Sequence, residues 1–333
     1  MLENQLSRYG AISRTVPQLA PGAKMFLVCD SDDTTVGPLN LGAEFPVDKD
    51  GVARVNTTIQ AGVNAASANR GDVVLVMPGY DQTLSRADSW ATAGVSVIGL
   101  GEGLNRPILR YAAITDEVGI KANNFTVENI RFLADVDSVA RGLDLDTGYS
   151  GATIRNCIFD FDTNTSNFVS MLRVGQSDVL IEENRFIAED TAGCGKGVEI
   201  FGGYADNLII RKNYFYGQFD TVGDTTNNAA AIACALVHDS GDTILSNIEI
   251  SENIIVSTDT ASAVLINLVP TAVSPIRGII RDNKLVTYDT ATADTAQVAF
   301  GTVLPLNNLM ISADSDDLEA VVGWSLKAGV KDS

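Results

Sequence analysis

A hexapeptide pattern recurs along the chain between residues 127 and 285. An aliphatic residue is followed five positions later by a second bulky apolar residue, with an asparagine between them. The copies are VENIRF at Val127, IRNCIF at Ile154, IEENRF at Ile181, IRKNYF at Ile210, ISENII at Ile250 and IRDNKL at Ile280. Their first residues are separated by 27, 27, 29, 40 and 30 positions. A hairpin needs only about 10 to 20 residues, so this period predicts one coil of a solenoid per repeat.

Short apolar stretches of strand length lie between the repeats. Each is bounded by Gly, Asp, Asn or Thr, which favour turns. They are GLDLD at 142–146, MLRV at 171–174, GVEIF at 197–201, AIACALV at 231–237 and AVLINLV at 263–269. Helical periodicity is nearly absent beyond residue 70. We therefore predict two or three short strands per coil, stacked coil on coil into parallel sheets.

The asparagine of the repeat is expected to mark a bend between two strands. Asparagine tolerates left-handed backbone geometry, and its amide can hydrogen-bond to the asparagine one coil away. It stands two residues after the aliphatic position in the first two copies (Asn129, Asn156) and three residues after it from Asn184 onward. Either the bend shifts by one residue between Asn156 and Asn184, or the first pair lies outside the asparagine ladder.

Together with GDVVLVMPGYDQ at 71–82 and VSVIGLGEGLNRPILRY at 95–111, these repeats resemble the right-handed parallel β-helices of the pectate-lyase-like superfamily. The resemblance covers about residues 52–312. It implies an all-β fold, a single-stranded right-handed parallel β-helix (solenoid) with a short N-terminal capping helix. It implies little about function, because the same solenoid carries lyases, hydrolases, isomerases and inert structural parts.

The capping helix is expected near residues 57–69. Thr57 or Thr58 can serve as its N-cap, and Ile59 and Val63 stand at helical spacing. Such a helix would cover the open strand edges at the start of the solenoid.

We divide the chain into three parts. Residues 52–312 form the β-helix, with room for eight or nine coils at this period. Residues 313–333 are expected to cap its far end. Residues 1–51 contain four prolines and only short apolar pieces such as MFLVC at 25–29. We interpret them as an N-terminal arm or appendage that either docks on a neighbour or wraps its own first coils.

Composition and charge narrow the class of partner. The chain has 42 acidic and 23 basic residues, a net charge of −19, which argues against nucleic acid and anionic membrane surfaces as partners. Its 45% of hydrophobic residues allows a large core.

The segment MLENQLSRYGAISR lacks the apolar core of a secretory signal, so we expect no export by signal peptide. We expect buried free thiols at the four scattered cysteines: Cys29, Cys157, Cys194 and Cys234.

Outward carboxylates are the candidate catalytic or calcium-binding groups. Strand alternation places Asp144 and Asp146 on one face, and Asp160 and Asp162 of FDFD have the same geometry. Glu199 is another outward carboxylate that could face Asp144 across the coils. Paired carboxylates can bind calcium or act as an acid–base couple, but such pairs are ordinary on the solvent face of so acidic a chain. We therefore assign no catalytic residue, no metal ligand and no cofactor.

Two further candidates are weighed in the same way. The single histidine, His238, precedes Asp239, but we interpret this pair as a strand end entering a turn, because no matched nucleophile accompanies it. The resemblance implies signature strings in the polygalacturonases (NTD, DD, GHG and RIK), and these do not occur here in a recognisable arrangement. Calcium-dependent pectate lyases place a catalytic arginine beside clustered aspartates. Arg141 and Arg173 lie near Asp144, without a specific pattern to support such a site.

These observations favour a structural role. We interpret the chain as a non-enzymatic bacteriophage virion structural protein, by analogy with β-helical rods that assemble in the host cytoplasm. It would be a trimeric capsid decoration, cement or fibre component that contacts other virion proteins of the capsid or tail. A flat apolar stripe along the rod is the surface feature expected of such a scaffold component.

Two enzymatic alternatives stay open. A tailspike-type polysaccharide depolymerase, either hydrolase or lyase, would line a groove with aromatic and acidic residues. Aromatic residues are only 7% of the chain, which favours the structural interpretation. A bacterial polysaccharide lyase or epimerase would need export to reach its substrate. Several of the aromatic residues are expected in core positions of the repeat, namely Phe132, Phe159, Phe186 and Phe215.

Overall fold

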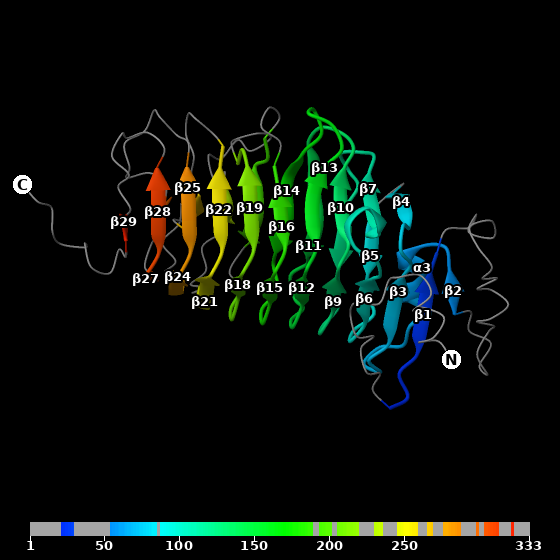
Figure 1. Cartoon of the computed structure of the whole chain (residues 1–333). Helices are drawn as coiled ribbons and strands as arrows, with labels where there is room; N and C mark the ends of the chain where they lie inside the picture. Colours follow the sequence, from blue (N-terminus) through cyan, green and yellow to red (C-terminus); the bar gives the residue numbers. More distant parts are fainter. Residues whose placement is uncertain are drawn as a thin grey trace, which may run out of the picture.

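The computed structural model shows an elongated β-solenoid (Figure 1). It describes residues 21–29, 54–84, 87–188, 193–201, 205–219, 230–235, 245–258, 265–268, 276–287, 298–299, 303–312 and 321–322. His238 lies outside these residues. No helix in the described part of the chain is long and apolar enough to cross a membrane.

Each coil of the solenoid contributes one strand to each of three sheets, called A, B and C. Sheet A contains, in spatial order, β2 (Val55–Asn56), β1 (Met25–Val28), β3 (Val73–Val76), β6 (Ser96–Gly99), β9 (Thr126–Glu128), β12 (Thr153–Arg155), β15 (Leu180–Glu182), β18 (Ile209–Arg211), β21 (Leu245–Ser251), β24 (Ile276–Arg281) and β27 (Leu304–Leu306). Sheet B contains β4 (Asp81–Leu84), β7 (Ile108–Tyr111), β10 (Arg131–Ala134), β13 (Ile158–Phe161), β16 (Arg185–Ile187), β19 (Tyr214–Gly217), β22 (Ile254–Ser257), β25 (Lys284–Thr287), β28 (Leu309–Ser312) and β29 (Val321–Val322). Sheet C contains β5 (Asp88–Trp90), β8 (Val118–Ile120), β11 (Val139–Leu145), β14 (Phe168–Val174), β17 (Lys196–Phe201), β20 (Ala230–Ala235), β23 (Ile266–Asn267) and β26 (Val298–Ala299). Helix α3 (Ile59–Ala65) precedes β3, and the 3₁₀ turn η2 (Gly103–Asn105) follows β6.

The pairing of these strands confirms the predicted right-handed parallel β-helix. Neighbouring strands in a sheet come from successive coils and run parallel, and the antiparallel pair β28–β29 is the exception among the described strands. From β3 to β26 the described strands make eight complete coils, and β27 and β28 begin a ninth. In Figure 1 the strands of sheet B form a row of arrows along the rod, from β7 to β28.

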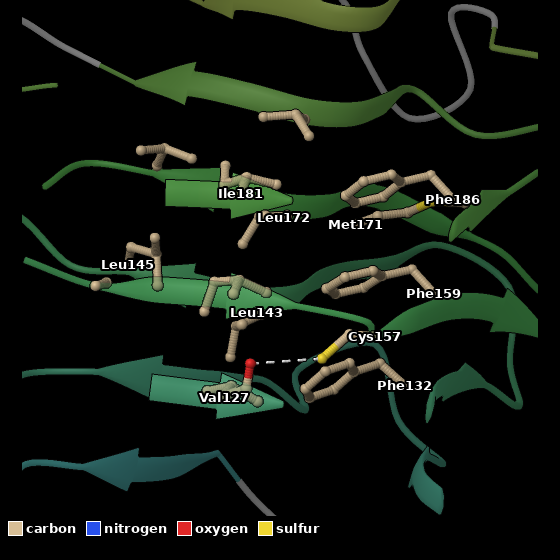
Figure 2. Close-up of a cluster of buried hydrophobic side chains, with 14 of the residues drawn as sticks. Val127, Phe132, Leu143, Leu145, Cys157, Phe159, Met171, Leu172, Ile181 and Phe186 are labelled. Carbon is tan, nitrogen blue, oxygen red and sulfur yellow. Dashed lines mark hydrogen bonds between the residues drawn. The ribbon is translucent and has the colours of Figure 1, made fainter. Parts of the chain in front are cut away.

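Inward-facing side chains stack coil on coil and fill the core. Phe132, Phe159, Phe186 and Phe215 occupy equivalent positions in sheet B and are fully buried, as predicted. The centroids of successive rings lie 4.8, 4.9 and 4.6 Å apart, with planes within 14° of parallel. This distance matches the spacing of neighbouring strands, so the sheet itself sets the stack. Figure 2 shows the first three of these rings beside the aliphatic core.

The bend from sheet A to sheet B uses two adjacent positions with different roles. The outer position has left-handed backbone geometry in every coil from the third onward, with φ between 51° and 60°. The residues there are Asn129, Asn156, Glu183, Lys212, Glu252, Asp282 and Asn307. The following, inner position is buried and carries Asn184, Asn213, Asn253, Asn283 and Asn308 in the later coils.

This arrangement decides between the two alternatives for the asparagines. The bend stays at the same position of the repeat, and Asn129 and Asn156 lie outside the ladder. The expectation that the ladder asparagines themselves take up the left-handed geometry is wrong, because the residue before each of them does so. The inner position selects asparagine for hydrogen bonding and not for backbone conformation.

Each ladder asparagine is hydrogen-bonded within its own coil stack. The Nδ2 of Asn213 donates to the carbonyl oxygen of Ile181 and to Oδ1 of Asn253, both at 3.0 Å. Its own Oδ1 accepts from the backbone N–H of Asn184 at 2.9 Å and from Nδ2 of Asn184 at 3.0 Å. The same pattern repeats upward through Asn283. Buried polar groups at the bend are therefore satisfied by the neighbouring coil.

Helix α3 covers the start of the solenoid, as predicted. Thr58 is its N-cap, and the Thr58 hydroxyl oxygen accepts a hydrogen bond from the backbone N–H of Ala61 at 3.1 Å. The side chain of Gln60 both donates to the carbonyl oxygen of Ser89 (2.9 Å) and accepts from its N–H (2.7 Å). The amide of Gln60 thus replaces a missing strand at the open edge of β5. Gly62 lets the helix approach Val74, since a Cβ there would lie 2.9 Å from a Val74 methyl.

Part of the segment that we assigned to an N-terminal arm has a defined place. The stretch MFLVC forms β1, which pairs in parallel with β3 and with β2 and so extends sheet A beyond the first coil. Asp72 ties this strand down, accepting from the backbone N–H of Lys24 at 2.7 Å and of Ser67 at 2.8 Å. The rest of residues 1–51 and most of residues 313–333 lie outside the described part, so those domain boundaries stay predictions.

Candidate functional site

The outer face of sheet C carries three of the carboxylates selected from the sequence, Asp144, Asp146 and Glu199. Asp144 faces outward from β11, while Leu143 and Leu145 are fully buried in the core, as the alternation predicted. Asp146 follows at the end of the strand and lies 3.5 Å from the amine of Lys121. Although it faces outward, Asp144 is only 2% exposed, because neighbouring side chains cover it.

An arginine separates the two carboxylates that were expected to meet. Asp144, Arg173 and Glu199 occupy the same register position of β11, β14 and β17. Arg173 donates to both oxygens of Asp144, at 2.8 and 2.5 Å, and its guanidinium lies 4.4 Å from the ring centroid of Phe201. Burial alone would lower the pKa of Arg173, but the hydrogen bond and charge of Asp144, followed by the charge of Glu199, raise it. In this row the positively charged Arg173 thus lies between the carboxylates of Asp144 and Glu199.

The surrounding charges on this face are also paired. The amine of Lys196 lies 3.3 Å from Glu199, and Arg141 lies 3.2 Å from Glu117 and 3.5 Å from Asp144. Within the part of the chain that the structure describes, no group of three or more His, Cys, Asp or Glu residues is arranged to hold a metal ion. The charged side chains on this face thus form ion pairs both within a coil and between neighbouring coils.

Asp160 and Asp162 lie on the outer side of sheet B and enter separate ion pairs. Asp160 contacts Arg131 at 2.7 Å, and Asp162 contacts Arg110 at 3.2 Å. Arg110 also binds Asp81, one coil earlier, at 2.8 Å. Burial alone would lower the pKa of Arg110, but Asp81 and then Asp162 raise it. Each of the two aspartates is thus held by a different arginine.

Sheet A carries a third set of ion pairs along the rod axis. In each pair a glutamate meets an arginine of the next coil, at 2.7 or 2.8 Å. The pairs are Glu128 with Arg155, Glu182 with Arg211, and Glu249 with Arg281. In register, Glu128, Arg155, Glu182 and Arg211 follow one another with alternating sign. The outer faces of sheets A and C are thus held coil to coil by charge.

A hollow of about 360 Å³ lies on the outer face of sheet B, and the sequence analysis did not identify it. Two tyrosines of β19, Tyr214 and Tyr216, present nearly parallel rings, with centroids 6.3 Å apart and planes at 11°. The guanidinium of Arg185 lies 5.8 Å from the centroid of Tyr214. Ile158, Asp160 and Ile187 complete the lining. Strand alternation about the core residue Phe215 could have predicted that both tyrosines point outward.

The described cysteines belong to the core. Cys29, Cys157 and Cys194 are buried. Burial raises the pKa of the Cys157 thiol to about 12, so it is no nucleophile at neutral pH. The side chain of Cys234 and the whole of His238 lie outside the described residues.

Comparison with known proteins adds little to this picture. No protein-family model and no curated protein matches the chain. Among solved structures, a pectin methylesterase from Aspergillus niger is similar at 13% identity, with 91% of this chain and 89% of that chain covered and a TM-score of 0.44. The pectate lyase Pel9A is similar at 12% identity, with coverage of 87% and 81% and a TM-score of 0.41. Likenesses this low carry no inference about activity, and neither bears on a bacteriophage origin.

Proposed function

We propose that the chain is a non-enzymatic structural rod, a component of a bacteriophage virion such as a capsid decoration, cement or fibre protein. The observation that supports this proposal best is that the outward carboxylates are engaged in ion pairs. Asp144, Glu199, Asp160 and Asp162 each meet an arginine or lysine within 3.5 Å. A general acid or base must exchange a proton with substrate, and a carboxylate held by a guanidinium is poorly suited to that task.

The same polar groups are well suited to holding a rod together. Of these ion pairs, Asp144 with Arg173 and Asp160 with Arg131 join successive coils, as the ladder asparagines and the stacked phenylalanines do. Because each coil contacts its two neighbours through identical positions, local opening must break contacts on both sides. A rod built this way is stiff and resists proteolysis, which supports a role in a particle exposed to the environment.

Incubation with a panel of capsular and pectic polysaccharides tests this proposal. Reducing-end release and absorbance of unsaturated products at about 235 nm are measured, with a known depolymerase as positive control. We expect no release above background. Release that is lost in Asp144→Asn but kept in Glu128→Gln, a carboxylate paired in the same way on sheet A, would assign enzymatic activity to the sheet C face.

The tailspike-type alternative, a polysaccharide depolymerase, has one observation in its favour. The hollow on sheet B combines two parallel tyrosine rings with Arg185 and Asp160, and aromatic rings beside charged groups are typical of sugar-binding surfaces. Activity in the polysaccharide panel that Tyr214→Ala abolishes and Leu104→Ala retains would favour this alternative. Leu104 is a matched control because it is 97% exposed and lies outside the hollow.

A further inference from the structure

We infer that the outer face of sheet B is a self-association surface, where further copies of this chain pack side by side with their rod axes parallel. The inference rests on the proposed structural function and names the partner of the rod. The surface, here called the B face, consists of the outward side chains of β13, β16, β19, β22 and β25. Its apolar members include Ile158, Ile187, Tyr214, Tyr216, Ile254 and Val256.

The B face concentrates apolar surface on one side of the rod. Tyr216 is 37% exposed and Ile254 is 39% exposed, and both belong to the few large apolar residues of the described chain that are this accessible. They lie on adjacent strands, where Tyr214 opposes Ile254 and Tyr216 opposes Val256. The outer face of sheet A carries paired charges along these coils, and sheet C carries them on β14 and β17. A contiguous apolar stripe on an otherwise charged rod marks an interaction surface.

The repeat of the rod specifies a second copy as the partner. The outward rows of the B face recur at about 4.8 Å along the axis, the spacing of neighbouring strands. A surface that fits these rows over several coils must have the same repeat, and a parallel copy of the chain has it. Cyclic symmetry about an axis parallel to the rods places identical coils at the same level, so that the rows meet over the whole stripe.

Charge also favours contact through this face. Two copies that each carry a net charge of −19 repel one another over most of their surface. From β16 to β25 the outward positions of the described strands include Arg185 and Lys284 and no acidic residue. Asp160, on β13 at one end of the B face, is the acidic residue among its outward positions, and it is paired with Arg131 of its own chain at 2.7 Å. From β16 to β25 the B face can thus meet itself without bringing carboxylates together.

The size of the face determines the concentrations to be tested. Five strands at about 4.8 Å and four residues at about 3.3 Å give a flat footprint of about 300 Å². A stable interface usually buries about 800 Å² per partner. We therefore expect reversible, concentration-dependent assembly, in which a ring of three adds area because each copy contacts two neighbours.

Sedimentation velocity of the full chain between about 1 and 100 μM tests the inference in this range. We expect a species of two or three times the monomer mass that grows with concentration. The double variant Tyr216→Asp/Ile254→Asp should weaken association at least tenfold, and Leu104→Asp, which adds the same charge at an exposed leucine off the B face, should leave it unchanged. Circular dichroism melting checks that the variants fold.

A wild-type monomer up to the highest concentration would overturn the inference, and so would assembly that the double variant retains. Binding of a polysaccharide that quenches tyrosine fluorescence in the wild-type monomer but not in Tyr214→Ala would reassign the face to a glycan. The proposed function fails separately. Polysaccharide cleavage by an assembled protein would overturn the non-enzymatic role and leave the self-association surface in place.

Discussion

The asparagine ladder offers the sharpest test of how this rod is stabilised, and Asn213 is its best-connected member. The side chain of Asn213 takes part in four hydrogen bonds, two as donor and two as acceptor, and is 1% exposed. The substitution Asn213→Ala removes all four. It leaves the backbone N–H of Asn184 without its acceptor and takes one donor from the carbonyl oxygen of Ile181.

The expected loss follows from these two changes. A buried polar group left without a partner costs about 1 to 3 kcal/mol. Nδ2 of Asn184 keeps its bond to Ile154, and Oδ1 of Asn253 keeps its bond from the backbone N–H of residue 213, so neither is orphaned. We therefore expect Asn213→Ala to lower the free energy of unfolding by about 3 kcal/mol.

Urea unfolding followed by circular dichroism measures this loss, with the unfolding rate as the readout if refolding is incomplete. Asn207→Ala is the matched control. Asn207 also exchanges side-chain hydrogen bonds with the coils on either side, with Asp178 at 2.8 Å and Asn247 at 2.9 Å, but these bonds are exposed and water can replace them. We expect the control to cost about 1 kcal/mol or less. Equal losses for the two variants would refute the argument that burial makes the inner ladder stabilising.

Three further predictions concern the ends of the ladder and of the rod. Cys157 occupies the ladder position below Asn184, and its Sγ lies 3.8 Å from the carbonyl oxygen of Val127 (Figure 2). Cys157→Asn should extend the ladder by one asparagine, so its free energy of unfolding in urea should exceed that of Cys157→Ala by about 1 kcal/mol. Equal stability of the two variants would contradict this. Gln60→Ala should uncover the edge of β5 and increase light scattering on heating, whereas Asn64→Ala on the same helix should not. Burial alone would raise the pKa of Asp72, but hydrogen bonds from Arg70, Ser67 and Lys24 outweigh it and lower the pKa. The stabilisation by the Asp72 carboxylate is therefore complete above about pH 4 and is lost as the pH falls through its lowered pKa. The difference in melting temperature between the wild type and Asp72→Asn should accordingly disappear in acid. A difference independent of pH would refute this role of Asp72.

The features that the sequence predicted correctly are those set by a repeating inward environment. The solenoid, its eight or nine coils and the core positions of the phenylalanines all follow from apolar residues that recur at one position of a coil, and Thr58 is one of the two threonines expected as the N-cap. Each inward side chain meets its own equivalent above and below, so the same residue type is selected again and again. The period is therefore visible without any knowledge of the register.

The left-handed bend position was missed for a physical reason. Its backbone geometry is constant, but its side chain is exposed in several coils, so Glu183 and Lys212 serve there as well as asparagine. The conspicuous asparagines belong to the next position, where burial demands hydrogen bonding. The residue pattern thus shows where a buried side chain must form hydrogen bonds, but it does not show which position has the left-handed backbone.

The charged rows could not be placed because register depends on loop length. Asp144, Arg173 and Glu199 are separated by 29 and 26 positions, so a coil of constant length would misalign them. Only the strand pairing shows that an arginine stands between the two carboxylates. The sequence could therefore not show whether Asp144 and Glu199 converge, because the lengths of the turns set the register of the strands.

The B face extends this reasoning from the core to the surface. Outward positions of sheet A from β9 to β18 and of sheet C from β11 to β17 are constrained by the next coil, and their charged residues alternate in sign accordingly. Outward positions from β16 to β25 lack that constraint within the chain, yet they hold Tyr214, Tyr216 and Ile254 where a solvated strand would tolerate polar residues. Exposed apolar side chains on the surface of the rod need a counterpart outside the chain to leave water. Another rod of the same kind shares their repeat, and for this reason we propose it as the partner and choose oligomeric state as the property to measure.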